Sequence, residues 1–248
     1  MDIFAFDSAD ELARALARRI AGALADTPDL VLGLAAGRTF TATYGEVVAL
    51  HERGEADFSR CTTFLLDEFA GLPTGHAGSL RSDVERDLIA RVNLDRARTH
   101  CLDGAAADLD AECHRYEHVF ERAGGLGLQL LGIGANGHIG FNEPADGLSA
   151  RTHRVMLSES TRHDNAARFG GDPSAVPHEA LTLGMGGILT AGGIVLAATG
   201  DRKSVAVARA VTGPVTTRLP ASFLQLHRRV ELYLDRAAAA RLPLRDGR

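Results

Sequence analysis

Three polar side chains follow an apolar run in the middle of the chain. Residues 128–133 have the length and branched side chains of a buried strand, and the loop after them contains Asn136, His138 and Glu143. An imidazole exchanges protons near neutral pH, and a carboxylate can orient it. The loop is therefore a candidate for acid–base chemistry. A glycine-rich turn with a chance histidine is the structural alternative.

The same loop is rich in glycine. Gly132, Gly134 and Gly137 predict a tightly shaped turn in which the backbone approaches a ligand closely. Their spacing also spells GxGxxG. The residues that follow are His-Ile-Gly-Phe-Asn-Glu-Pro rather than a dinucleotide-binding helix, so a nucleotide cofactor is not predicted.

Two further strand ends have the pattern of anion sites. The strand predicted over 30–34 runs through Gly37, Arg38 and Thr39 into a helix, which places backbone N–H groups and a helix dipole at the turn. Lys203 lies in the first turn of another helix, where a cation is unfavourable unless an anion binds beside it. A tight connection without a ligand and a solvated lysine are the respective alternatives.

A pair of carboxylates follows the strand predicted over 62–66. Asp67 and Glu68 stand at its carboxyl end, the edge at which open parallel α/β sheets bind ligands. Acidic residues at such positions are also common as helix caps or solvated turns.

Strands and helices alternate along the whole chain. Apolar periodicity predicts helices over 9–25, 79–92 and 108–123, and a short polar helix over 161–169 that contains Arg168. Further strands are expected at 3–6, within 148–157, and at 180–184 and 193–199. No linker or repeat divides the sequence. The expected fold is α/β: a single doubly wound, mostly parallel sheet with helices on both faces, forming one domain over 1–248.

Composition narrows the classes of function. The net charge of −5 and the absence of a basic tract argue against binding to nucleic acid or an anionic membrane. Three cysteines without metal-type spacing are expected to be free thiols in a reducing compartment. No leader-like start or membrane-spanning apolar run is evident, so a cytoplasmic location is expected.

Taken together, four segments resemble the glucosamine-6-phosphate deaminase family. They are Gly134-Ala-Asn-Gly-His-Ile-Gly-Phe-Asn-Glu-Pro144, Leu66-Asp-Glu-Phe-Ala-Gly-Leu-Pro73, Val176-Pro-His-Glu-Ala-Leu-Thr182 and Ser222-Phe-Leu-Gln-Leu-His227. The first is the most specific, because the related 6-phosphogluconolactonases lack its Phe-Asn-Glu-Pro ending.

The resemblance implies a reaction without metal or coenzyme, part of N-acetylglucosamine catabolism. D-glucosamine 6-phosphate and water would give D-fructose 6-phosphate and ammonia. Asp67 would move a proton between carbons 2 and 1. His138 would open the pyranose ring, with Glu143 holding its other nitrogen. Asn136 occupies a catalytic position that is Asp in some members and Asn in shorter ones.

A second set of residues would hold the substrate, an amino-sugar phosphate. The resemblance assigns Gly37, Thr39 and Lys203 to the phosphate, with Arg168 nearby and Arg38 as an added cation. Glu68 and Gly137 complete the expected substrate-binding set. Association of identical chains is also considered. The residues that bind an activator in some hexameric members of the family are only partly recognisable around 149–154.

The sequence departs from the family pattern at two of these positions. In the phosphate loop, Arg38 replaces a small residue and Phe40 a proline. The family arginine falls on Ala167 without a gap, and Arg168 restores it with a one-residue shift. Two alternatives therefore stand beside the deaminase: an enzyme for a different amino-sugar phosphate, and a sugar-phosphate sensor without turnover.

Overall fold

Seven parallel strands form the central sheet, which the computed structural model describes within residues 1–243. The strands are Asp2–Phe6 (β1), Val31–Leu34 (β2), Thr62–Leu65 (β3), Thr99–His100 (β5), Leu128–Leu131 (β6), Ile194–Ala198 (β9) and Val230–Asp235 (β10). Their order across the sheet is β1-β10-β9-β6-β2-β3-β5, and every neighbouring pair is parallel. The predicted mostly parallel α/β fold is confirmed.

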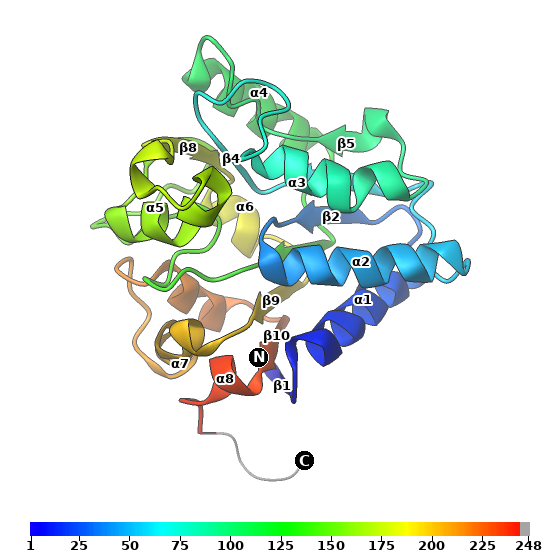
Figure 1. Cartoon of the computed structure of the whole chain (residues 1–248). Coiled ribbons are helices and arrows are strands. Elements are labelled where there is room, and N and C mark those ends of the chain that lie inside the picture. The colour runs from blue at the N-terminus through cyan, green and yellow to red at the C-terminus, as the bar shows by residue number, and fades with distance from the viewer. Residues whose placement is uncertain (244–248) are drawn as a thin grey trace.

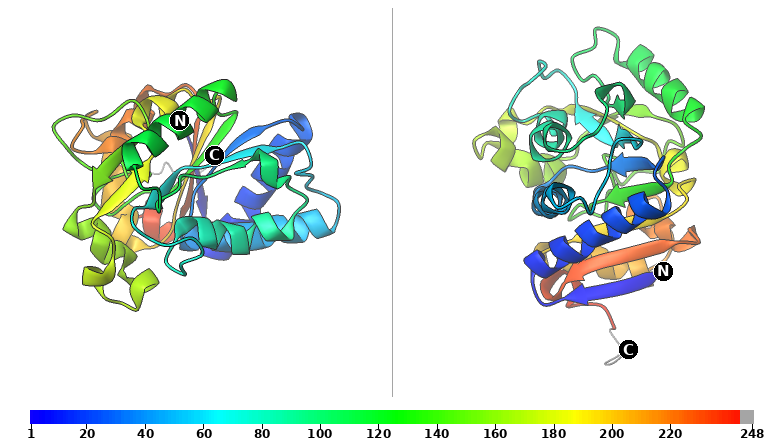
Figure 2. Two further views of the ribbon diagram at one scale, coloured as in Figure 1. Left: turned by 90° about the horizontal axis from the view of Figure 1, so that it is seen from above. Right: turned by 90° about the vertical axis from the view of Figure 1, so that its right-hand side faces the viewer.

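Helices cover both faces of this sheet. They are Ala9–Asp26 (α1), Arg38–Glu52 (α2), Leu80–Asp87 (α3), Leu109–Arg122 (α4), Glu159–Asn165 (α5), Met185–Leu189 (α6), Ser204–Thr212 (α7) and Arg236–Ala239 (α8). Short 3-10 turns are Ile89–Arg91 (η1), Arg96–Arg98 (η2), Ala166–Phe169 (η3), Pro173–Ala175 (η4), Asp201–Lys203 (η5) and Pro220–Leu226 (η6). Figure 2 shows α4 and the group α1 to α3 on opposite sides of the strands.

The core is divided in two by the sheet because successive strand residues point to opposite faces. Leu130 packs with side chains of α1, α2 and α3, whereas its neighbour Leu131 packs with those of α4, α6 and α7. Both leucines are fully buried. This double burial explains why the strands were recognisable as continuous apolar runs.

The chain changes direction across the sheet between β2 and β6. From β2 it continues to β3 and β5 on one side, whereas β6, β9 and β10 follow on the other. At such a switch point the two connections leave in opposite directions and open a crevice beyond the carboxyl ends of the strands. The loops after β2 and β6 therefore border one crevice. In Figure 1 the strands point toward α5, which lies at that end of the sheet.

Two of the expected strands do not join the central sheet. His153–Met156 (β7) and Glu179–Thr182 (β8) form a separate antiparallel sheet with Asp67–Phe69 (β4), in the order β4-β8-β7. The expectation of a single sheet was wrong on this point. The chain passes from β3 to β4 through Leu66 alone, so the acidic pair begins a new strand instead of a turn. Figure 1 shows β4 and β8 close to α5.

Two predicted helices end earlier than expected. The helix expected over 79–92 ends at Asp87, because Leu88 has φ −133° and ψ −62°. Its periodic side chains continue to face the core after the helix has ended, as the buried Leu88 shows. The short polar helix expected over 161–169 becomes α5 followed by the tighter turn η3.

Within residues 1–243, no helix is long and apolar enough to cross a membrane. The last five residues of the charged tail, 244–248, lie outside the described residues. The single domain expected over 1–248 stays a prediction.

Candidate active site

A cavity of about 760 Å³ lies at the switch point of the sheet. Its walls come from the loops that follow β2, β6 and β9, from the start of β4, and from α3, α5 and η3. The volume is within the range of small-molecule sites. Of the residues expected in the site, Gly37, Arg38, Thr39, Asp67, His138, Arg168 and Lys203 line the cavity.

The α2 helix begins at this cavity without a side-chain cap. Helices α1, α3, α4 and α5 are each preceded by a Ser or Asp side chain that accepts a backbone N–H, but α2 follows Gly37. Gly37 has φ 123°, a conformation that suits glycine. The backbone N–H groups of Arg38 and Thr39 have no acceptor within the helix. Together with the helix dipole they favour an anion in the cavity.

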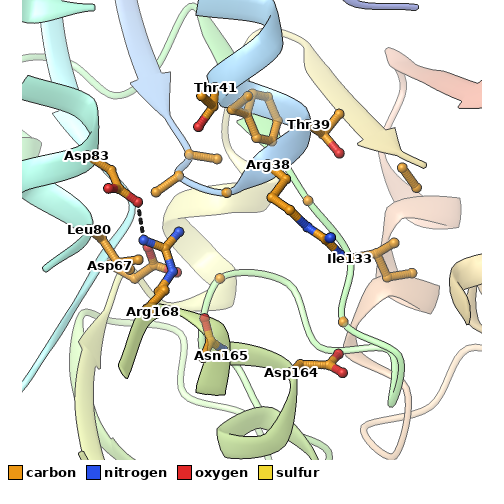
Figure 3. A pocket seen from close by; sticks show the side chains of 18 of the residues that line it. Arg38, Thr39, Thr41, Asp67, Leu80, Asp83, Ile133, Asp164, Asn165 and Arg168 are labelled. Atoms are coloured by element: carbon orange, nitrogen blue, oxygen red, sulfur yellow. Dashed lines mark hydrogen bonds and ion pairs between the residues drawn. The ribbon is translucent and has the colours of Figure 1, made fainter. Parts of the chain in front are cut away.

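Four Arg and Lys side chains line the cavity: Arg38, Arg168, Arg202 and Lys203. The Arg168 guanidinium forms an ion pair with Asp83, and Lys203 Nζ lies 3.0 Å from Asp164 Oδ2. Within residues 1–243, Arg38 forms no ion pair. In Figure 3, Arg38 extends into the cavity from α2, and Arg168 lies beside Asp67 on the other side. Arg38 is therefore the cation most readily available to an incoming anion.

Asp67 begins β4 and faces the cavity from a buried position. Asp67 is only 7% exposed. Burial and, to a smaller extent, the charge of Glu68 raise the pKa of the carboxyl, whereas Arg168 lowers it, and the resulting pKa is about 7. No group among residues 1–243 donates a hydrogen bond to it. A carboxyl in this state can both remove and return a proton near neutral pH.

Glu68 does not line the cavity, which corrects its predicted placement beside Asp67 at the ligand edge. Successive residues of β4 point to opposite sides. The Glu68 carboxylate instead accepts hydrogen bonds from the backbone N–H groups of Phe69, Leu80 and Arg81 at 2.8, 3.1 and 2.9 Å, and from Ser79 Oγ at 2.6 Å. It fixes the N-terminus of α3 against the second sheet.

His138 presents its ring to the cavity from the loop after β6. The ring passes so close to Gly134 that a Cβ atom there would lie 2.2 Å from His138 Cε1. Nδ1 lies 3.1 Å from Thr161 Oγ1 and 3.9 Å from Glu143 Oε2. Burial lowers the pKa of the imidazole and Lys203 adds to this, whereas Glu143 and Asp164 oppose it. The ring is therefore disposed to be neutral and ready to accept a proton.

Asn136 and Glu143 lie behind His138 and do not line the cavity. Asn136 Nδ2 donates to Glu143 Oε2 at 2.8 Å, and Asn136 Oδ1 accepts from the backbone N–H of His138 at 3.1 Å. The resemblance implied that Glu143 holds the other nitrogen of His138. The structure corrects this, because the 3.9 Å separation between His138 Nδ1 and Glu143 Oε2 exceeds hydrogen-bond length.

Gly137 also lies away from the cavity, in contrast to its predicted substrate-binding role. It has φ 90°, and its carbonyl accepts from the backbone N–H of Ala221. A Cβ atom at this position would lie 2.1 Å from Leu219 Cδ1. Gly137 is thus required by close packing of the loop against η6.

Sequence reasoning missed several polar residues of the site. Asp83 and Asp164 pair with the cavity cations, and Ser158 and Thr161 lie between Glu143 and His138. The signal available for the last two was the helix-capping pattern, since the Ser158 side chain caps α5. That pattern indicates a helix start and does not reveal what else the hydroxyl contacts.

An anion site beside a buried carboxyl and an imidazole defines an enzyme of the class that acts on phosphorylated small molecules. The sequence profile of glucosamine-6-phosphate isomerases/6-phosphogluconolactonase matches residues 5–233, and the chain belongs to this family.

Two curated relatives carry the name glucosamine-6-phosphate deaminase. The one from Beutenbergia cavernae is 42% identical over 246 residues, which is 99% of this chain and 94% of the relative. The one from Halothermothrix orenii is 44% identical over 232 residues, covering 94% and 96%. A solved structure described as a monomeric glucosamine-6-phosphate deaminase is 38% identical with a TM-score of 0.93, covering 97% of this chain and 100% of that one.

Replacing Gly134 by alanine should displace the His138 ring and lower turnover by about 100-fold or more, the usual contribution of a positioned acid–base group. Gly22→Ala is the matched control, because no atom lies within 4 Å of a Cβ at that helical position. Steady-state kinetics, measured together with thermal melting, separates a loss of turnover from a loss of stability. Equal turnover in both folded variants would contradict the placement of the ring.

Glu68→Gln should lower the free energy of unfolding by roughly 2–4 kcal/mol, because an amide nitrogen would face buried donors. The exposed Glu52→Gln serves as the control. Urea denaturation measures both, and equal midpoints would show that Glu68 is not the structural acceptor described above.

Proposed function

We propose that the chain is a glucosamine-6-phosphate deaminase, which converts D-glucosamine 6-phosphate and water to D-fructose 6-phosphate and ammonia. The observation that supports this most strongly is the shared cavity of Asp67, His138 and the uncapped start of α2. A sugar phosphate bound at α2 would have its carbon skeleton directed toward the two proton-transfer groups. The names of the closely similar relatives agree with this reaction.

In the first step the sugar ring opens. His138 takes the proton of the hydroxyl on carbon 1 and delivers a proton to the ring oxygen, which leaves an aldehyde at carbon 1. A neutral imidazole is the form required to begin this step, and burial in the cavity wall favours it.

In the second step Asp67 removes the proton from carbon 2 while a proton of the substrate's ammonium group passes to the carbon-1 oxygen, giving an enol with the amino group on carbon 2. Asp67 then returns the proton to carbon 1, so that carbon 2 becomes an iminium ion. Addition of water to carbon 2 releases ammonia and leaves the ketone. A carboxyl whose pKa is about 7 suits both halves of this transfer.

The phosphate group would bind at the N-terminus of α2. Its oxygens would accept hydrogen bonds from the backbone N–H groups of Arg38 and Thr39 and from the side chains of Arg38 and Lys203. Thr39 Oγ1 lies 3.0 Å from Thr199 Oγ1, which ties the α2 loop to the end of β9. This binding far from carbons 1 and 2 orients the reacting part of the substrate.

A different amino-sugar phosphate is the second candidate substrate, because the Arg38 side chain occupies space at the phosphate loop that a small residue would leave open. The expected absence of a cofactor, association of identical chains and a cytoplasmic location stay predictions. As regards association of identical chains, one solved relative is described as monomeric.

A coupled assay for ammonia and fructose 6-phosphate tests the function, with other amino-sugar phosphates and 6-phosphogluconolactone as competing substrates. Rapid turnover of glucosamine 6-phosphate supports the deaminase. Preference for another amino-sugar phosphate supports the second candidate. Thermal stabilisation by the substrate without release of ammonia would indicate a sensor and contradict both enzymes.

Asp67→Asn should lower kcat by about 10²- to 10⁴-fold, because the base for carbon 2 is lost. In the wild type, kcat/KM should rise with pH through about 7 as the carboxyl ionises. Asp67→Asn should have a higher melting temperature than the wild type at pH 8, but its melting temperature should differ little from that of the wild type at pH 4. Ammonia release at the wild-type rate would exclude Asp67 as the base.

Arg38→Ala should raise KM for glucosamine 6-phosphate by roughly 10-fold or more, the effect of losing a hydrogen bond from a charged group. The exposed Arg122→Ala, on α4, is the control for loss of one positive charge. A gain in activity on removing Arg38 would show instead that this side chain blocks the phosphate loop.

A further inference from the structure

The carboxylate of Glu143 and the imidazole of His138 are joined through two hydroxyl groups. His138 Nδ1 lies 3.1 Å from Thr161 Oγ1, and Thr161 Oγ1 lies 3.1 Å from Ser158 Oγ. Ser158 Oγ in turn lies 3.2 Å from both Glu143 oxygens. Every link in this chain has hydrogen-bond length, whereas the direct separation of 3.9 Å does not.

The Glu143 carboxylate is held in place by other donors. The backbone N–H of Ser158 donates to Oε1 at 3.1 Å, and Asn136 Nδ2 donates to Oε2 at 2.8 Å. Glu143 is 8% exposed. It cannot turn toward the histidine without breaking these bonds, so contact with the imidazole has to pass through the hydroxyls.

The hydroxyls are held just as firmly. Thr161 is fully buried, and its backbone N–H donates to Ser158 Oγ at 3.2 Å as part of the α5 cap. Thr161 does not line the cavity and so cannot contact a substrate there. Its side chain therefore acts on the reaction only through His138.

Donor geometry sets the direction of the chain. Ser158 Oγ is the donor toward both Glu143 oxygens and toward Thr161 Oγ1. Its oxygen accepts from the backbone N–H of Thr161 and from Asn136 Nδ2, which use both of its lone pairs. The Thr161 hydroxyl therefore faces His138 Nδ1 as the hydrogen-bond partner of the ring.

We propose that Thr161 and Ser158 are positioning residues for ring opening, which set the His138 tautomer and connect the imidazole to Glu143. The proposal rests on the proposed function, in which His138 takes the proton from carbon 1. When His138 becomes charged, its Nδ1–H donates to Thr161 Oγ1, so the positive charge faces the two hydroxyls and the carboxylate behind them. The neutral ring and the imidazolium are thus held in one orientation throughout the step.

Thr161→Val tests the chain, because it removes the hydroxyl and keeps the shape of the side chain. We expect kcat to fall by about 10- to 100-fold with KM little changed, the equivalent of one hydrogen bond to a charged group. Thr161→Ser should restore most of the activity. Thr63→Val is the matched control, because Thr63 is also fully buried but its hydroxyl has no hydrogen-bond partner among residues 1–243.

A second readout does not depend on turnover. NMR titration of the His138 ring reports both its pKa and its tautomer. The charges facing the ring are Glu143 on its own loop, Asp164 on α5 and Lys203 on η5, and Thr161→Val leaves all three in place. We expect the His138 pKa to fall in this variant and the balance of its two neutral tautomers to shift, because Nδ1 loses its hydrogen-bond partner, with neither change in Thr63→Val.

Unchanged kcat together with an unchanged His138 titration in a folded Thr161→Val variant would overturn the proposal. The hydrogen-bond chain and the proposed reaction can be tested separately. If the wild type releases no ammonia but Thr161→Val still shifts the His138 titration, the hydrogen-bond chain stands and the proposed reaction is wrong.

Discussion

The buried carboxyl of Asp67 is the constraint on which the rest of the site depends. The chain leaves the central sheet after Leu65 and enters the second sheet at Asp67, so this side chain is enclosed where the two sheets meet. Burial favours its protonated form. Because the folded-state pKa is raised, this group favours the folded protein most at low pH, and that contribution is lost as pH rises through about 7. Stability at neutral pH is therefore reduced, and the carboxyl concerned is the one that the proposed reaction uses as its base.

The other charges around the cavity are arranged differently. Arg168 and Lys203 are each paired with a carboxylate, on α3 and α5 respectively, so neither adds an uncompensated charge to the cavity. The anion site instead rests on an uncapped helix start and on Arg38. A phosphate dianion would supply the cap that α2 lacks. The uncapped backbone N–H groups at the start of α2 are therefore groups that the substrate is proposed to satisfy.

Much of the fold and of the cavity lining could be predicted from the sequence, because buried parallel strands have a strong local apolar pattern. Apolar runs ending in glycine located the β2 and β6 loops, and hence Gly37 and His138. The placement of Glu68 could not be predicted, since β4 is only three residues long and its alternation is too short to read. The hydrogen bonds of Thr161 were also hidden, because they join α5 to a loop 23 residues away. Arg168 reaches the cavity from the turn η3, which no periodic pattern in the sequence predicts.

The central claim is that Asp67 moves the proton between carbons 2 and 1. Its most direct test is deuterium incorporation from D₂O into carbon 1 of fructose 6-phosphate in the presence of ammonium, followed by NMR. The wild type should exchange one hydrogen at carbon 1, and folded Asp67→Asn should exchange none over the same period. Exchange by Asp67→Asn at the wild-type rate would contradict the account and assign the carbon acid chemistry to another group.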